Sequence, residues 1–319
     1  MVGRKVVLVG CGFVGMSMAY SLLQNQSSVN ELVLIDLNKE KAEGEAMDLS
    51  HGLPYVNSHM KIYAGDYSDC NNADVIVITA GVAQKPGQTR LDLAAVNTKI
   101  MKSIGLEIKK SGFSGVIVCA SNPCDLMTYV LQKVTGLPKE KVFGSGTMLD
   151  TARLKYLIAD FLNVNPQSVH GYILGEHGDS SFVPWTYTYI GVKPLIKYCE
   201  EHNIELSALL DIYEEARDAA YYIIEKKKAT YYGIGIALAR LVKIILNDEQ
   251  LVMPLSVYQN GEYGYSGIYT GVPAVVTRDG IKEVLKLKLN EFDQTKLNKS
   301  CDQLQDTIDN VVTPILNAE

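Results

Sequence analysis

Short runs of apolar residues alternate with longer amphipathic stretches through the first half of the chain. The short runs are rich in β-branched residues and predict buried strands, whereas apolar residues at helical spacing predict helices. The expected strands are residues 5–9, 32–35, 75–78 and 116–119, and the expected helices are residues 16–24, 39–49 and 98–110. Because a parallel connection needs a crossover of that length, this alternation predicts a doubly wound parallel sheet.

The second half has a different pattern. Residues 169–174 predict a strand that leads into a glycine-rich turn, and residues 206–246 predict a long helical stretch, broken or kinked around 232–235. Two further strands, 251–257 and 267–276, are expected on either side of a turn-rich segment, and residues 291–316 predict a last helix. The expected fold is α/β, with a Rossmann-type doubly wound parallel sheet in residues 1–146. An α+β substrate-binding and catalytic domain is expected in residues 147–319.

Composition narrows the function classes. The 319 residues are 47% hydrophobic and 21% charged, which suits a globular protein, and the net charge of −6 argues against a nucleic-acid partner. No stretch reaches the roughly 18 uninterrupted apolar residues of a membrane span. The six cysteines are scattered without a close CxxC pair, so buried, reduced thiols are expected and a zinc site is not. We expect a cytoplasmic protein with no metal and no membrane partner.

A glycine-rich turn follows the first predicted strand. Gly10, Gly12 and Gly15 form a GxGxxG motif that opens the first predicted helix, and Asp36 ends the second predicted strand. The first glycine permits a tight turn, the second lets the main chain approach a pyrophosphate, and the third lets helix and strand pack closely. The helix N-terminus offers N–H groups to phosphates. Asp36 would accept hydrogen bonds from ribose hydroxyls and repel a 2′-phosphate, so the motif predicts NAD rather than NADP.

Polar residues that suit reduction of a 2-keto acid follow further along the chain. His177 lies in the glycine-rich turn after residues 169–174 and has the side chain best suited to proton exchange at neutral pH. Asp150 is the candidate carboxylate that would orient it. Arg153, three residues later on one face of a predicted helix, would anchor a substrate carboxylate. By spacing alone, an Asp and an Arg three residues apart are more often a surface ion pair.

Residues 84–90 form a polar segment containing proline and glycine, just past the strand that ends before Thr79. This composition is typical of a mobile lid, and an ordinary solvated loop has the same composition. Arg90, at the far end, would polarise the substrate carbonyl. The strands that end before Gly10, Asp36, Thr79 and Asn122 are all expected to open onto one crevice, because ligands of an open α/β sheet lie beyond the carboxyl ends of its strands.

In combination these motifs resemble the L-lactate/malate dehydrogenase family, and most closely its bacterial L-lactate dehydrogenases, over essentially the whole chain. The matching stretches include residues 10–15, 47–52, 84–93, 121–125, 144–147, 149–153, 173–179, 229–233 and 271–274. The resemblance implies reversible hydride transfer between NADH and pyruvate, giving L-lactate and NAD+, in a homotetramer.

The resemblance also assigns roles to single residues. It implies His177 as proton donor and acceptor, Asp150 as its partner, and Arg90 as the residue that polarises the carbonyl. The implied substrate contacts are Gln84, Arg90, Asn122, Arg153 and Thr230. The implied cofactor contacts are Gly10, Gly12, Val14, Gly15, Asp36, Lys41, Tyr67, Gly81, Ser103, Asn122 and Ser145.

Two alternatives share this fold: a malate dehydrogenase and a branched L-2-hydroxy-acid dehydrogenase. Gln84 favours pyruvate over a dicarboxylic substrate, because a neutral side chain can lie over a methyl group without stranding a charge. A non-catalytic structural protein is a further alternative, against which the intact set of polar site residues argues. Lys155 stands where members activated by sugar bisphosphates carry Arg, while His170 is kept, so only a weak or absent response to such an effector is expected.

Overall fold

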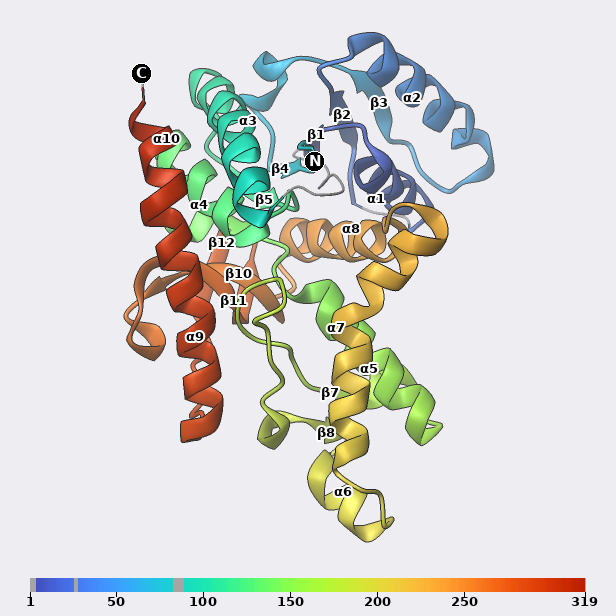
Figure 1. Cartoon of the computed structure of the whole chain (residues 1–319). Coiled ribbons are helices and arrows are strands. Elements are labelled where there is room, and N and C mark those ends of the chain that lie inside the picture. Colours follow the sequence, from blue (N-terminus) through green and yellow to red (C-terminus); the bar gives the residue numbers. More distant parts are fainter. Residues whose placement is uncertain (1–3, 26–27, 83–88, 319) are drawn as a thin grey trace.

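The computed structural model describes residues 4–25, 28–82 and 89–318, without the side chain of Arg90 (Figure 1). Within these residues one nine-stranded sheet has the order β12-β11-β10-β6-β5-β4-β1-β2-β3. Its strands are β1 (Lys5–Val9), β2 (Glu31–Ile35), β3 (Lys61–Ala64), β4 (Val75–Ile78), β5 (Val116–Cys119), β6 (Val142–Gly144), β10 (Leu251–Asn260), β11 (Ser266–Thr277) and β12 (Gly280–Val284). A second, small sheet contains β7 (Val169–His170), β8 (Tyr189–Ile190) and β9 (Lys193–Pro194).

The strands from β1 to β6 are parallel, as the sequence predicts. Strands β1, β4 and β5 have the expected bounds, and β2 begins one residue earlier. All three expected bounds fall on fully buried runs, and such continuous apolar runs are typical of parallel strands covered on both faces. The pattern did not predict β3 and β6, because a partly exposed edge strand and a strand of three residues leave little apolar signal.

Helices cover both faces of this sheet (Figure 1). The described helices are α1 (Phe13–Gln24), α2 (Lys39–His51), α3 (Arg90–Lys110), α4 (Cys124–Thr135), α5 (Met148–Leu162), α6 (Leu195–Glu201), α7 (Ser207–Lys227), α8 (Tyr232–Asn247), α9 (Glu291–Thr307) and α10 (Thr313–Asn317), of which α6 lies away from this sheet. The prediction that a helix starts at residue 98 was wrong by eight residues. Helix α3 begins at Arg90, where Thr89 and Asp92 form a capping box.

The second half departs from its predicted elements in two places. The expected strand at 169–174 is reduced to β7, and further along only Leu174 pairs, in an isolated bridge with Phe182. The long helical stretch does break, but between α7 and α8, at residues 228–231, which lies before the expected kink. Lys228 has φ of 74°, and this left-handed conformation ends α7.

One contact joins the two halves into a single sheet. The antiparallel hairpin of β10 and β11 continues the parallel strands because Ser256 of β10 pairs with Gly144 of β6. A Cβ atom at Gly144 would lie 2.5 Å from Thr128 Oγ1 and 3.0 Å from Ser256 Cβ, so only glycine fits this junction. The sheet therefore changes from parallel to antiparallel where the chain passes into its second half.

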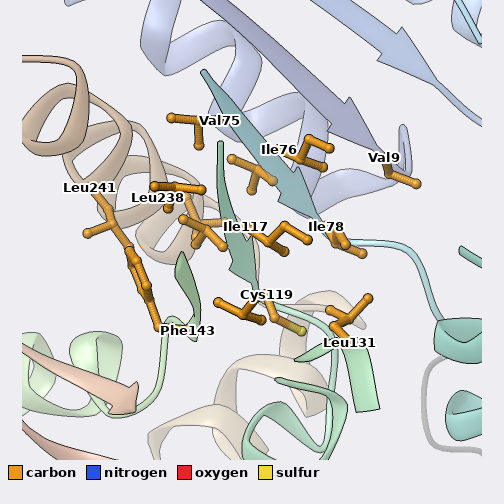
Figure 2. Packing of buried hydrophobic residues seen from close by; sticks show 14 of the residues in the cluster. Val9, Val75, Ile76, Ile78, Ile117, Cys119, Leu131, Phe143, Leu238 and Leu241 are labelled. Atoms are coloured by element: carbon orange, nitrogen blue, oxygen red, sulfur yellow. The ribbon is translucent and has the colours of Figure 1, made fainter. Parts of the chain in front are cut away.

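The main hydrophobic core follows this sheet and includes residues from Val6 to Val312. Figure 2 shows its centre, where Leu238 and Leu241 of α8 pack near Val75 of β4 and Phe143 of β6. A second cluster lies between α5, α6 and α7 and includes Leu154. The last helix is held against the first half, because Lys102 Nζ of α3 donates a hydrogen bond of 2.6 Å to the carbonyl of Ala318. Among the described helices, none is both long and apolar enough to cross a membrane.

Candidate functional site

The three glycines after β1 have three different surroundings. Gly10 has φ of 103°, and a Cβ there would lie 2.5 Å from the backbone nitrogen of Ala80. A Cβ at Gly15 would lie 2.2 Å from the carbonyl oxygen of Gly10. Around Gly12, by contrast, the described chain has nothing within 4 Å of such an atom. Two glycines are thus required by the protein's own packing, and Gly12 borders open space of the kind a pyrophosphate needs.

The start of α1 and the end of β2 meet beside that space. Gly12 is the N-cap of α1, and no side chain caps this N-terminus. Asp36 accepts a hydrogen bond of 2.7 Å from the amide of Cys11 and one of 2.9 Å from the amide of Asn38. These bonds fix the Asp36 carboxylate, which is partly exposed, next to the glycine turn. An N-terminus with N–H groups to offer and a fixed carboxylate at this distance along the chain fit the phosphates and ribose of NAD.

The carboxyl ends of neighbouring strands are tied to one another. Thr79 Oγ1 donates to the carbonyl of Gly10 at 2.7 Å, and Ser121 Oγ donates to the carbonyl of Ala80 at 2.5 Å. The parallel pairing of β2, β1, β4 and β5 sets these ends side by side. The prediction that these strand ends lie side by side is therefore confirmed, and the ligand crevice beyond them stays a prediction.

Asn97 of α3 is a buried residue that the sequence did not single out. Its Nδ2 donates to the carbonyl of Asn122 at 2.7 Å, and its Oδ1 accepts from the amide of Val82 at 2.9 Å. It therefore joins the segment after β4 to the segment after β5. A lone asparagine inside a helical pattern gives no sequence signal for such a role.

The other residues expected around the cofactor lie on elements that border the same edge. Tyr67 begins a short 3-10 helix after β3, and burial raises the pKa of its hydroxyl to about 12. Ser145 follows β6, is buried, and lies 3.6 Å from Cys124 Sγ. Val14 is in α1, Lys41 in α2, Gly81 just after β4, and Ser103 in α3.

Three of the expected site residues, His177, Asp150 and Arg153, lie together. His177 Nδ1 is 2.6 Å from Asp150 Oδ2, and Arg153 Nη1 donates to Asp150 Oδ1 at 3.1 Å. The charge of Asp150 raises the pKa of His177 to about 8, against the opposing effect of burial. Burial is the largest single effect on Asp150 and opposes its ionisation, but the charge and hydrogen bond of His177 and the charge of Arg153 together lower the pKa of this carboxyl. Asp150 is therefore buried, its partner Arg153 is largely buried, and both are linked to a histidine, which excludes the alternative of a surface ion pair.

In the described chain, His177 and Arg153 each use only part of their hydrogen-bonding capacity on Asp150. His177 Nδ1 is occupied by Asp150, while Nε2 has no protein partner in the described chain. Arg153 uses Nη1 on Asp150, and its other guanidinium nitrogens have no partner among those residues. A proton donor next to a cation suits a small anion that carries an oxygen to be protonated.

The backbone of the His177 turn is held from three sides. The amide of Gly175 donates to the carbonyl of Gly271 in β11 at 2.9 Å. The amide of Glu176 donates to Ser300 Oγ in α9 at 2.6 Å, and the amide of His177 donates to Asp125 Oδ2 in α4 at 2.9 Å. The sequence did not assign Asp125 or Ser300 any role, because these contacts span 52 and 124 residues.

For the other expected residues the described structure shows less. Gln84 lies outside the described residues. Arg90 begins α3, but its side chain is not described. Thr230 is half-buried between α7 and α8. Lys155 of α5 is half-buried, and burial lowers its pKa, whereas His170 of β7 is exposed. Within the described chain no group of three or more His, Cys, Asp or Glu residues could hold a metal.

Comparison with known proteins agrees with this geometry. Residues 4–144 match the lactate/malate dehydrogenase NAD-binding domain, and residues 147–314 match the lactate/malate dehydrogenase alpha/beta C-terminal domain. An L-lactate dehydrogenase of Lactococcus lactis subsp. cremoris is 50% identical over 309 residues, which is 97% of this chain and 98% of that protein. L-lactate dehydrogenase 2 of Bacillus cereus is 51% identical over 96% of this chain and 97% of its own.

Solved structures give the same result. The minor L-lactate dehydrogenase from Enterococcus mundtii, in its ligand-bound form, superimposes with a TM-score of 0.95 at 47% identity, covering 98% of this chain and 99% of its own. A lactate dehydrogenase from a Medee basin deep-sea metagenome library has a TM-score of 0.94 at 48% identity, with the same coverage. The chain belongs to the lactate/malate dehydrogenase family, with an NAD-binding Rossmann domain and an α/β C-terminal domain.

Proposed function

We propose that this protein is an L-lactate dehydrogenase that catalyses reversible hydride transfer between NADH and pyruvate. The observation that carries the proposal is the contact of His177 and Arg153 with one buried carboxylate, Asp150. It supplies a proton donor and an anion anchor, both oriented by the same residue. The names of the relatives at about 50% identity over nearly the whole chain support the same substrate pair.

NAD is the family's cofactor, and the crevice after β1 fits it. The backbone after Gly12 would hold the pyrophosphate and Asp36 the adenosine ribose. Val14, Lys41, Tyr67, Gly81, Ser103, Asn122 and Ser145 complete the proposed contacts, together with Gly10 and Gly15. When bound, the nicotinamide supplies or accepts the hydride.

The protein's own residues then divide the remaining work. The free guanidinium edge of Arg153 binds the substrate carboxylate in a charge-assisted pair. His177 Nε2 donates a proton to the oxygen that becomes the lactate hydroxyl, and takes it back in the reverse direction. Asp150 stabilises the imidazolium that this role requires. Arg90 and Asn122 are proposed to polarise the carbonyl, and Thr230 to line the pocket.

The organisation of the molecule extends the proposal. We place the domain boundary between residues 146 and 147, which is supported by matches that end at 144 and begin at 147. A cytoplasmic homotetramer is the proposed form. Lys155 and His170 are proposed as a weakened anion site for sugar-bisphosphate effectors, because Lys lacks the two parallel donors of Arg.

An absorbance assay with NADH tests the substrate. We expect a much larger kcat/KM for pyruvate than for oxaloacetate or 2-ketoisocaproate. A preference for oxaloacetate would indicate a malate dehydrogenase, and a preference for 2-ketoisocaproate a branched 2-hydroxy-acid dehydrogenase. If none of the three keto acids led to oxidation of NADH, the proposed function would be wrong.

Substitution Gln84→Arg tests the discriminating position. We expect the preference to move from pyruvate towards oxaloacetate by orders of magnitude, because a new guanidinium pairs with the second carboxylate and is stranded by a methyl group. The ratio of the two kcat/KM values in variant and parent measures this. A ratio within about threefold of the parent would mean that residue 84 does not face the substrate side chain.

A further inference from the structure

We propose that Asp125 is a second carboxylate of the catalytic centre: a positioning residue that holds the backbone of His177 and supports the positive charge of its ring. This inference rests on the proposed function, since it concerns the proton that His177 transfers. Asp150 acts on the imidazole ring directly, whereas Asp125 acts through the main chain.

The contacts of Asp125 are few, short and directional. Its Oδ2 accepts from the amide of His177 at 2.9 Å, and its Oδ1 accepts from Ser256 Oγ at 2.5 Å. The side chain is buried, with 2% of its surface exposed. Leaving a buried carboxylate without partners is costly, so both donors are needed to keep it charged.

Three parts of the fold meet at this carboxylate. Asp125 is in the first turn of α4, Ser256 is in β10 opposite Gly144, and His177 is in the turn that follows β7. The positive end of the α4 dipole favours a negative charge at this position. Of the three groups that accept the amides of residues 175–177, Asp125 alone carries a charge, since the other two are the Gly271 carbonyl and the Ser300 hydroxyl.

The effect of Asp125 on the protonation of His177 depends on whether Asp125 is ionised. Burial raises the pKa of this carboxyl to about 6, and the hydrogen bonds from Ser256 and His177 limit the rise. Above pH 6 it is therefore an anion, which favours the imidazolium of His177 over the neutral ring. The charged or titratable groups around the pair are Asp150 and Arg153 from α5, Glu176 from the turn, Cys124 from α4, Cys119 from β5 and Cys301 from α9.

Substitution Asp125→Asn separates charge from shape. The amide oxygen can still accept from the His177 amide, and the amide nitrogen can donate to the Ser256 hydroxyl, so the hydrogen bonds survive while the charge is lost. We expect the pKa of His177 to fall in the cofactor-free protein, because the charge of Asp125 raises it in the parent. Histidine NMR measures this directly, because the chain has only five histidines and His177→Asn identifies the signal.

The activity readout is the pH profile of pyruvate reduction. We expect the alkaline limb of kcat/KM in Asp125→Asn to move to lower pH by the same amount. In Asp125→Ala, which also frees the His177 amide, kcat should fall roughly 100-fold, the scale of a 1 Å misplacement of a reacting group. Affinity for NADH, followed by its fluorescence, should stay within about twofold of the parent in both variants.

Asp293→Asn is the matched control. Asp293 is likewise a buried aspartate in the first turn of a helix, α9, but its carboxylate accepts from Asn290 and does not contact the His177 turn. Loss of stability common to both Asn variants measures the general effect of neutralising such a residue. Should Asp125→Asn fail to fold, Ser256→Ala takes its place. It removes one hydrogen-bond donor to Asp125 and should therefore raise the pKa of Asp125. The pKa of His177 should fall, as it does in Asp125→Asn.

The outcomes for Asp125 and for the proposed function are distinct. A parent enzyme inactive on all three keto acids overturns the function, while the NMR titration still reports on Asp125. An active parent, with Asp125→Asn showing the parental His177 pKa, pH profile and kcat, overturns the positioning role. A lowered His177 pKa with an intact NADH affinity supports it.

Discussion

At residue 177 an imidazole has a carboxylate on one ring nitrogen and no protein partner on the other in the described chain. Such a ring can pass a proton to a ligand without turning, because Asp150 fixes its orientation at 2.6 Å. Arg153, also hydrogen-bonded to Asp150, sets the distance at which a substrate carboxylate would lie from that proton. Each of these residues is ordinary by type, and the proposed function depends on the carboxylate that they share.

Removal of the proposed proton donor, His177, should slow the reaction. His177→Asn should lower kcat by about 10² to 10⁴, the usual contribution of a positioned general acid. Binding of NADH, measured by fluorescence titration, should be unchanged, because the cofactor crevice is built by other elements. A parental kcat in this variant would exclude His177 from proton transfer.

The pH dependence follows from the raised pKa of His177, about 8. Pyruvate reduction consumes the protonated ring, so kcat/KM should be constant well below pH 8 and fall as the pH rises through it. Lactate oxidation needs the neutral ring and should rise through the same range. Asp150→Asn removes the largest cause of the shift, and the midpoint should move to lower pH. Midpoints that coincide in Asp150→Asn and the parent would refute this assignment.

The role of a single residue could be predicted from the sequence where the residue belongs to a known motif. It could not be predicted where the role depends on a partner far away in the chain. His177, Asp150 and Arg153 were candidates by residue type, and the family resemblance assigned their roles, because spacing alone favoured a surface ion pair for Asp150 and Arg153. Asn97 and Asp125 were not candidates, because an amide and a carboxylate in a helical pattern resemble any solvated polar residue until the fold buries them. Gln84 and the side chain of Arg90 stay predictions.

Among the elements, the glycine turn between β1 and α1 contains glycines required for packing and one, Gly12, that is proposed to serve ligand binding. In Gly12→Ala the new methyl group meets nothing within 4 Å in the described part of the chain. The variant should therefore leave the melting temperature nearly unchanged and weaken NADH binding at least tenfold, which corresponds to about 1.4 kcal/mol. Calorimetric titration with NADH measures the affinity.

Gly44→Ala in α2 is the control for Gly12→Ala. It too meets nothing within 4 Å, but it lies on an exposed helix face. It should bind NADH like the parent and raise stability by up to about 1 kcal/mol, because alanine favours the helix. Equal NADH affinity in both alanine variants would place the pyrophosphate elsewhere.

Elements were predictable in proportion to their hydrophobic signal. Strands β1, β4 and β5 have the expected bounds because every residue in them is buried. Residues 169–174 have a similar composition, but most of them pair with no strand, since apolar side chains can also pack beneath an irregular segment. That β10 continues the parallel sheet through Gly144 could not be predicted, because one pairing across 112 residues leaves no local pattern.

For the molecule as a whole, the continuous sheet predicts cooperative unfolding. Leu8 in β1 and Leu304 in α9 are buried in the same cluster although they lie at opposite ends of the chain. Leu8→Ala and Leu304→Ala should each destabilise the protein by about 2–5 kcal/mol and lower one shared calorimetric transition. Two transitions, each shifted by only one substitution, would show that the halves unfold independently.

The same cooperativity should appear in the rate of amide hydrogen exchange at the turn of residues 175–177. Its three amides are donated to β11, α9 and α4, which come from both halves of the chain. Solvent deuterium can replace each of these hydrogens only when the element that accepts it releases the turn. A loop is ordinarily the first part of a protein to exchange, whereas these amides should exchange at rates close to those of the central strands. The catalytic turn would then be as long-lived as the core itself.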